Sequence, residues 1–305
     1  MASIESHRRA HRGGGAYLWY SLGTLGLFVL TGAAVLTFDS VLLCIPFAIG
    51  QGLAVIAFSN AAHECTHGNF MRTLRGNHVV GALWMLPILL VFIVHRRYHL
   101  DHHRHTAQPD DPEGTFAYTR TRSIAPYIRG ALRWTVFPSP LHCLNWYHSA
   151  LAIAGRPSAW CQRAEDRRLV AWNAAALTVW IIGMSAATLA AHWLLWVYWL
   201  PVCVVGPFLA WFTALPRHVG AGSSTEPVDN TRTVRTTRLL QAILWNFNLH
   251  TAHHAFPGEP FHRLPAIDSQ LRAEIRHQTS GYFAFHVELV RSLWSGRPLG
   301  ATRAS

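Results

Sequence analysis

The sequence predicts an all-α integral membrane protein, with four transmembrane helices in two hairpins and a cytoplasmic helical cap that carries a histidine-rich di-metal site. Three observations predict it. Half of the 305 residues are hydrophobic and only 13% are charged, which is typical of a chain whose surface faces lipid. The apolar residues fall into four runs long enough to cross a bilayer. Many of the 20 histidines lie in clusters outside those runs.

The four apolar runs predict the spans. A transmembrane helix needs about 20 apolar residues, and the runs cover Tyr17–Phe38, Val41–Phe58, Leu169–Ala191 and Trp193–Leu215. Short turns at 37–40 and 190–193 join the runs in pairs, which predicts two hairpins. No internal repeat or linker divides the chain. We therefore expect a single membrane domain over 1–305, with a basic N-terminus at 1–16, a core at 17–264 and a tail at 265–305.

The arginines predict the orientation. Every basic residue is an arginine, the net charge is +11, and neither short turn contains an arginine. Because an excess of arginine marks the cytoplasmic side, we expect both termini and the metal site to be cytoplasmic. Arg8, Arg9 and Arg12 are part of this argument. The arginines flank the apolar runs and form no stripe that would read DNA, so no nucleic-acid partner is expected.

A fifth apolar stretch, Val79–Val94, is short for a span and contains Pro87. A complete crossing would separate His63 from His99 by about 30 Å of hydrocarbon. A single metal centre could not then use both histidines. We therefore expect this stretch to dip into the membrane and return to the same side.

Three histidine clusters indicate metal binding. Residues three and four apart share a helix face, so each cluster can aim two or three imidazoles at one point. Imidazole suits iron, zinc, copper and nickel. Eight histidines are too many for one ion but fit two ions with about four ligands each. The clusters are HECTH (His63, His67), HLDHH (His99, His102, His103) and HTAHH (His250, His253, His254).

HECTH also fits the H-E-x-x-H pattern of zinc proteases, in which Glu64 would be the general base. An intramembrane zinc metalloprotease is therefore an alternative of another class. It would leave the six later box histidines without a role. We expect Glu64 instead to orient a metal-binding histidine.

The three boxes resemble those of the membrane fatty acid desaturase superfamily, which also contains acyl hydroxylases and carotenoid ketolases. The resemblance covers about Tyr17 to Leu264 and includes the flanking stretches HLDHHRHTAQPDDPE, NTRTVRT and WNFNLHTAHHAFPGEPFHRLP. By this resemblance, the eight box histidines ligate two irons and His218 in PRHVG is a ninth ligand. Many members have a glutamate before this histidine, whereas this chain has Arg217.

The resemblance implies an oxygen-dependent di-iron desaturase that introduces a double bond into a fatty acyl chain or a similar amphiphile. A hydroxylase or ketolase of the same superfamily, acting on a carotenoid or a small specialised metabolite, is the alternative. Two iron ions are the implied cofactors, and O2 is the co-substrate. The sequence has no dinucleotide fingerprint, no haem motif and no C-x-x-C pair among its five cysteines. We therefore expect an external ferredoxin or cytochrome to deliver the electrons.

Four more polar residues lie close to the boxes. His95 is one turn before His99 and can face the site, and His105 can support it from outside. Asn246 and Asn248 precede the third box, where an amide either holds a metal-bound water or caps and packs a helix.

Overall fold

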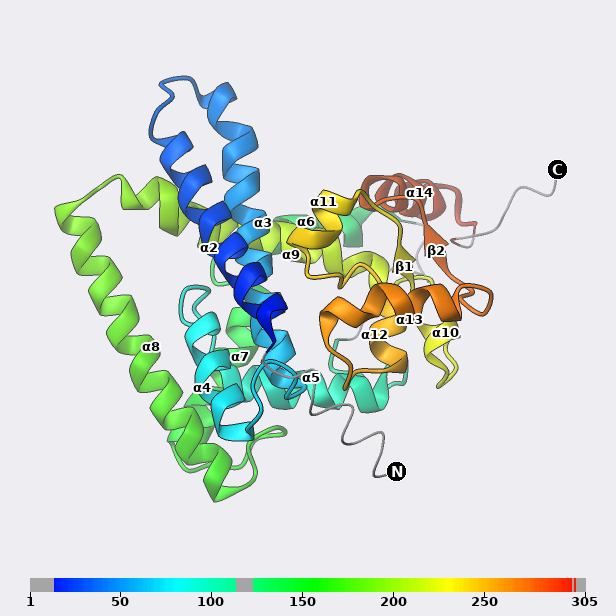
Figure 1. Ribbon diagram of the computed structural model, residues 1–305, viewed down its shortest axis with the longest axis horizontal. Coiled ribbons are helices and arrows are strands. Elements are labelled where there is room, and N and C mark those ends of the chain that lie inside the picture. Colours follow the sequence, from blue (N-terminus) through cyan, green and yellow to red (C-terminus); the bar gives the residue numbers. More distant parts are fainter. Residues whose placement is uncertain (1–13, 114–122, 298, 300–305) are drawn as a thin grey trace. The chain divides into compact units, whose positions relative to one another are not determined.

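The computed structural model describes residues 14–113, 123–297 and 299, and these residues are mostly helical (Figure 1). The chain divides into two compact units: unit 1 comprises Met1–Leu100 and Trp134–Leu209, and unit 2 comprises Asp101–Arg133 and Ala210–Ser305. The expectation of a single domain over 1–305 stays a prediction. The N-terminal arginines Arg8, Arg9 and Arg12 lie outside the described residues, as does the end of the tail.

Unit 1 contains the long helices. Helix α5 continues from unit 1 into unit 2, and α6 and α9 also cross the boundary in the chain. The elements are α2 (Gly15–Val35), α3 (Val41–Thr66), α4 (Leu74–Met85), α5 (Phe92–His105), α6 (Ala125–Thr135), α7 (Pro140–Ile153), α8 (Ala164–Ala190), the π-helical segments η2 (Leu195–Trp199) and η3 (Pro201–Val205), and α9 (Gly206–Ala214).

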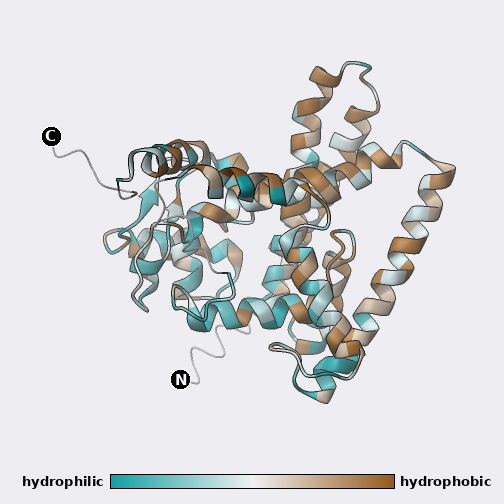
Figure 2. Cartoon of the chain, turned by 180° about the vertical axis from the view of Figure 1, so that it is seen from behind, coloured by the Kyte–Doolittle hydropathy of each residue, from teal (hydrophilic) through white to brown (hydrophobic). Residues whose placement is uncertain are grey.

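Four helical segments are long and apolar enough to cross a membrane, as the sequence predicts: Gly15–Val35, Val41–Thr66, Ala164–Ala190 and Leu195–Arg217. Hydrophobic residues lie along them in Figure 2. Many of these side chains face outward; Trp172, Val179 and Leu189 on α8 are 76%, 72% and 79% exposed. Such exposure in water is costly, and it fits a surface that contacts lipid.

Helix α3 is longer than its apolar run, which ends at Phe58. Residues 59–66 are more polar but include two alanines and no proline or glycine, so no strong helix breaker ends the helix within them. The first histidine box therefore lies on the last turns of a continuous helix.

Small residues allow α3 to pack closely against η3 and the start of α9. A methyl group added to Gly52 would lie 2.6 Å from a methyl of Val205, and one added to Gly206 would lie 2.4 Å from a methyl of Val55. Between apolar helices, close approach of the backbones replaces the hydrophobic effect as the source of packing energy.

The fifth apolar stretch is not a continuous helix. Helix α4 ends at Met85 and α5 begins at Phe92, and residues 86–91 form a turn in which Leu89 has a left-handed φ of 61°. Residues 88–94 are at most 5% exposed. The break agrees with the expected change of direction, while the return to the same side of a membrane stays a prediction.

Side chains from α7 and η2 hydrogen-bond the backbone of this turn. Buried non-helical backbone requires such partners, because its polar groups have no access to water. Positions 142, 145 and 146 of α7 share one helix face. The contacts are Asn145 with N and O of Val91 (2.9 and 3.0 Å), His142 Nε2 with Ile88 O (3.0 Å), Trp146 Nε1 with Leu89 O (2.8 Å), and Tyr198 OH with Pro87 O (3.1 Å).

Unit 2 has shorter elements. After α9 they are η4 (Leu215–Arg217), α10 (Pro227–Asn230), β1 (Thr233–Val234), α11 (Arg238–Ile243), α12 (His250–Ala255), η5 (Phe261–Arg263), α13 (Leu264–Leu271), β2 (Gln278–Thr279) and α14 (Tyr282–Ser295). Strands β1 and β2 pair in parallel, with Thr233 opposite Gln278 and Val234 opposite Thr279. The described residues are mostly helical, as predicted, and this pair is a small β element that the sequence does not predict. Two residues per strand are too few for sequence periodicity to indicate a strand.

A buried arginine holds the segment that ends α9. Arg232 Nη1 donates to Pro216 O at 2.8 Å and to Val219 O at 2.6 Å, and the guanidinium lies over the ring of Phe285. Burial lowers the pKa of Arg232 to about 10, which still leaves the group charged at neutral pH. These bonds fix the backbone on both sides of His218.

Candidate metal centre

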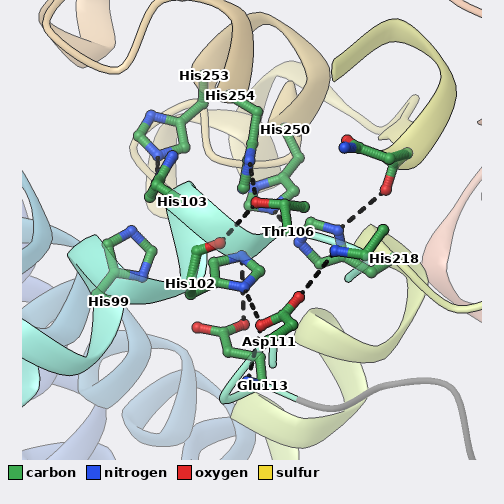
Figure 3. Close-up of polar contacts among 12 residues, drawn as sticks. His99, His102, His103, Thr106, Asp111, Glu113, His218, His250, His253 and His254 are labelled. Atoms are coloured by element: carbon green, nitrogen blue, oxygen red, sulfur yellow. Dashed lines mark hydrogen bonds and ion pairs between the residues drawn. The ribbon is translucent and has the colours of Figure 1, made fainter. Parts of the chain in front are cut away.

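Four histidines of unit 2 converge on one point (Figure 3). They come from three places in the sequence: His102 from α5, His218 from the residues after η4, and His250 and His254 from α12. Their ligand nitrogens all lie within 4.8 Å of one another, and all four residues are buried. His218 is therefore brought together with one histidine of the second box and two of the third.

The positions of His250 and His254 on α12, and of His218 after η4, determine the distances between the imidazoles of this cluster. His250 and His254 are four residues apart on α12 and so share one face. His250 Nε2 lies 2.9 Å from His218 Nε2, so the two nitrogens point at nearly the same place. The ring of His102 lies edge-on to His218 and to His254, with ring centroids 4.8 and 5.1 Å apart.

Three of the four rings have a partner at Nδ1. His102 Nδ1 lies 2.7 Å from Asp111 Oδ1, and His218 Nδ1 lies 3.2 Å from Asn230 O. His254 Nδ1 lies 3.4 Å from Thr106 Oγ1, whose hydroxyl donates to the carbonyl of residue 102. A neutral imidazole that donates from Nδ1 leaves the lone pair of Nε2 for a metal.

Asp111 is a further candidate functional residue, which the histidine pattern of the sequence does not reveal. Besides contacting His102, its carboxylate accepts the backbone N–H groups of Ala107 at 3.0 Å and Glu113 at 2.9 Å. The loop after the second box thus folds back on the box. The signal in the sequence is the acidic run QPDDPE, which follows the second box within a few residues.

Burial favours neutral imidazoles in this cluster. Burial, together with neighbouring charges, lowers the pKa of His218, His250 and His254, and for His250 the charge of Arg217 contributes. Burial also acts to lower the pKa of His102, but the carboxylates of Glu113 and Asp111 reverse the net direction and raise it. Metal binding requires deprotonated imidazole, so three of the rings are already in the form that binds metal.

The donor set fits a transition-metal ion. Nε2 of His254 is buried and has no hydrogen-bond partner among the described residues, which is costly unless something else occupies the site. Adjacent ligands of an octahedral ion lie about 3 Å apart when each metal–nitrogen bond is about 2.1 Å. The 2.9 Å separation of the His218 and His250 nitrogens matches this spacing.

Unit 2 also pairs the two remaining histidines that it holds from the second and third boxes. His103 Nε2 lies 3.0 Å from His253 Nε2, and the ring of His103 stacks on that of His254 with centroids 4.1 Å apart. Within unit 2, α5 and α12 therefore bring a second pair of imidazole nitrogens together.

Unit 1 brings the first box together with the start of the second. His63 Nε2 lies 2.7 Å from His99 Nε2, and the ring of His67 lies 4.8 Å from that of His63 and 5.2 Å from that of His99, between centroids. His95 lies parallel to His99 with centroids 6.1 Å apart. The histidines at the end of α3 and the first histidines of α5 thus lie together within unit 1.

Glu64 contacts a tyrosine. Tyr17 OH donates to Glu64 Oε2 at 2.6 Å, and the two residues are 2% and 1% exposed. The contact ties α2 to the last turns of α3, and therefore to the helix that carries the first box. The expected role of Glu64 in orienting a histidine stays a prediction.

The asparagines before the third box have structural partners. Asn246 donates to Phe261 O at 3.1 Å and accepts from Gln241, and Asn248 donates to Val234 O at 2.9 Å. Asn246 also has a left-handed φ of 60°. These bonds favour packing over a role in holding a metal-bound water. His105, for its part, pairs with Asp101 at 3.2 Å.

The structure thus combines four helices long and apolar enough to cross a membrane with clusters of imidazoles that could hold metal ions. The family model "Fatty acid desaturase" matches residues 38–286. Because this match covers most of the chain, the protein belongs to the fatty acid desaturase family.

Three characterised or named relatives match part of the chain. The sn-1 oleoyl-lipid 12-desaturase of Picosynechococcus sp. is 28% identical over 123 residues, 37% of this chain and 35% of that protein. The sn-1 oleoyl-lipid 12-desaturase of Anabaena variabilis is 31% identical over 96 residues, 28% of this chain and 27% of that protein. A Sorghum bicolor protein named "Probable fatty acid desaturase DES1" is 31% identical over 126 residues, 41% of this chain and 32% of that protein.

Each match spans about a third of the relative's length. The family assignment therefore rests on the longer match of the family model, over residues 38–286. The family assignment lends no support to the alternative of a zinc metalloprotease whose metal site is formed by HECTH.

Proposed function

We propose that this protein is an oxygen-dependent di-iron desaturase that introduces a double bond into a fatty acyl chain or a similar amphiphile. One observation carries the proposal: in a chain of the desaturase family, four buried imidazoles converge, and three of them have a partner at Nδ1 that leaves Nε2 for a metal. A metal centre requires imidazoles whose orientation and tautomer are fixed in this way.

We assign the metal ligands to the eight box histidines and His218. Unit 2 offers one complete set of four, namely His102, His218, His250 and His254. One iron needs about four ligands, so we assign the remaining histidines to a second iron: His63, His67, His99, His103 and His253. Bound iron would supply the activation of dioxygen and the removal of hydrogen, which no side chain can achieve. The chain's own part is to hold neutral imidazoles, to fix their orientation and to exclude water.

An apolar pocket in unit 1 supports an acyl substrate. It has a volume of about 490 Å³ and is lined by Phe28, Phe58, Trp180 and other apolar side chains, with Gln51 as one of few polar residues. Pockets of this size and character bind small apolar molecules. Phe58 precedes His63 by five residues on α3, which is about 7.5 Å along the helix axis. A chain held in this pocket would extend toward the first box.

For the topology we propose two hairpins, α2 with α3 and α8 with the segment 195–217, and a cytoplasmic cap that carries the metal site. The support is the absence of arginine from the short turns at 37–40 and 190–193, whereas the other loops are rich in it. Both termini are then cytoplasmic.

We further propose that an external ferredoxin or cytochrome delivers the electrons. The chain has neither a dinucleotide fingerprint nor a cysteine cluster that would hold its own redox group. Its excess of arginine would attract an acidic carrier.

The test combines metal analysis with product analysis. Purified protein in lipid should contain two irons per chain, and with a reductant, a carrier and O2 it should convert acyl lipids to products with one more double bond, as measured by mass spectrometry. His254→Ala should lower the iron content and abolish the product, whereas His192→Ala, at an exposed position, should change neither. A hydroxylated product alone would contradict the desaturase assignment and favour the hydroxylase or ketolase alternative. One zinc in place of iron would favour the protease.

A further inference from the structure

A small polar pocket in unit 1 lies where α3 ends and α4 begins. Its volume is about 190 Å³, and its lining includes His67, Arg72, Thr73, Asn77 and Arg96. Two arginines thus face one cavity, and no carboxylate lines it. This cavity is separate from the apolar pocket that we assign to the acyl chain.

The two arginines have no acidic partner. Neither Arg72 nor Arg96 forms an ion pair within the described residues, whereas the neighbouring Arg97 pairs with Asp166 at 2.7 Å. Arg96 Nε donates to Thr66 O at 3.1 Å, which fixes the guanidinium at the end of α3. Burial, with the charge of Arg97, lowers the pKa of Arg96. An anion in the pocket would offset this desolvation, and guanidinium groups bind phosphate in a bidentate manner.

The backbone adds further positive potential. Helix α4 has twelve residues and begins with Thr73 as its N-cap, whose side chain accepts from Gly76 N at 3.0 Å. The free N–H groups of a helix N-terminus attract anions. Asn77 bonds both N and O of Met71 and also Thr73 O, at 2.7–3.0 Å. The loop that forms one wall of the pocket is therefore fixed in place by its own hydrogen bonds.

The surface next to the pocket is apolar. Leu74, Val79 and Leu83 on α4 are 56%, 61% and 59% exposed, and α3, whose end forms part of the pocket, is one of the four candidate spans. Exposed apolar side chains beside arginines are typical of a protein surface at the level of lipid headgroups. An amphiphile fits this combination better than a soluble anion or an acidic protein does.

We propose that this pocket binds the anionic phosphate of a membrane-lipid headgroup, while the acyl chains of the lipid lie against the exposed apolar side chains of α4. The inference goes beyond the proposed function and does not depend on it, because neither arginine needs a metal or O2 to bind phosphate.

The test measures lipid binding by the purified full chain. Native mass spectrometry in detergent would give dissociation constants for phosphatidic acid, phosphatidylglycerol and phosphatidylcholine. We expect the anionic lipids to bind wild-type protein at least 10-fold more tightly than phosphatidylcholine, and the double variant Arg72→Gln/Arg96→Gln to lose this preference. Arg168→Gln is the matched control, since it removes an exposed arginine of unit 1 outside the pocket. Its preference should equal that of the wild type.

Three outcomes would overturn the proposal. The first is an unchanged preference in the double variant. The second is displacement of the lipid by inorganic phosphate at equal concentration, which would make the site one for free phosphate. The third is equal loss in Arg168→Gln, which would indicate attraction by overall charge. If the double variant fails to fold, Arg72→Gln alone decides, because Arg72 is exposed and its replacement should leave the fold intact.

Discussion

The carboxylate of Asp111 holds the imidazole of His102. Asp111 Oδ1 lies 2.7 Å from His102 Nδ1, and the residues are 7% and 0% exposed. The other bonds of Asp111 go to backbone N–H groups of its own loop. These bonds fix the carboxylate, so it holds the ring of His102 in one orientation. The orientation of one proposed iron ligand is thus set by the loop that follows the second box.

Asp111→Asn should weaken metal binding at the unit 2 cluster. The amide lacks the negative charge, and it can no longer accept from both His102 and the backbone of residues 107 and 113. Loss of such a partner typically lowers metal affinity by about 10–100-fold. The measurement is iron retained per chain during titration with a chelator.

The neighbouring residue offers a matched control for this prediction. Asp110→Asn makes the same chemical change at an exposed position and should retain iron as the wild type does. Equal iron loss in both variants, or in neither, would show that Asp111 does not position His102.

Asn145→Leu should destabilise unit 1. Asn145 bonds both the N–H and the carbonyl of Val91, and the carbonyl also accepts from His95 N at 3.2 Å. Leucine has a similar volume but leaves the buried N–H of Val91 without its partner, at a cost of about 1–3 kcal/mol. We expect the free energy of unfolding in detergent to fall by about 1–3 kcal/mol. Tyr147→Phe, at a position that is 61% exposed, should change it little.

The sequence predicts the spans and the histidine boxes because both depend on local patterns. An apolar run of about 20 residues and an i, i+4 pair of histidines need no information about the rest of the chain. The structure accordingly has four helices of spanning length and brings His102, His218, His250 and His254 together. His218 needed the family resemblance, since a single histidine forms no pattern.

The partners of these histidines could not be predicted in the same way. Asp110 and Asp111 are adjacent and chemically identical, and only the fold of the loop, which includes a left-handed Ala107 with φ of 64°, decides which carboxylate reaches His102. The contact of Asn145 with Val91 joins residues 54 apart. Contacts of this kind depend on tertiary packing, which a single sequence does not reveal.

Tyr17→Phe should weaken the link between α2 and the first box. The hydroxyl of Tyr17 donates to buried Glu64 at 2.6 Å, and a hydrogen bond to a charged group contributes about 1.5–3 kcal/mol. We expect a loss of stability in this range and a lower iron content, measured by unfolding in detergent and by metal analysis. Iron content equal to wild type despite lower stability would separate the structural link from the metal site.

His142→Gln should change the pH dependence of stability. His142 lies between Ser139 Oγ at 2.7 Å and Ile88 O at 3.0 Å, and burial lowers its pKa from 6.5 to about 4. The unfolded chain therefore takes up the proton first as the pH falls. The stability from the neutral ring is fully present above pH 6.5 and is lost toward pH 4. A shift of this size corresponds to about 3 kcal/mol.

Glutamine can donate to Ile88 O but does not titrate. The difference in unfolding free energy between wild type and His142→Gln should therefore shrink by about 3 kcal/mol between pH 7 and pH 4, in denaturant titrations in detergent. His192→Gln replaces an exposed histidine of the same unit and should run parallel to the wild type. Parallel curves for His142→Gln as well would mean that the ring between α7 and the turn at Ile88 is not held in its neutral form.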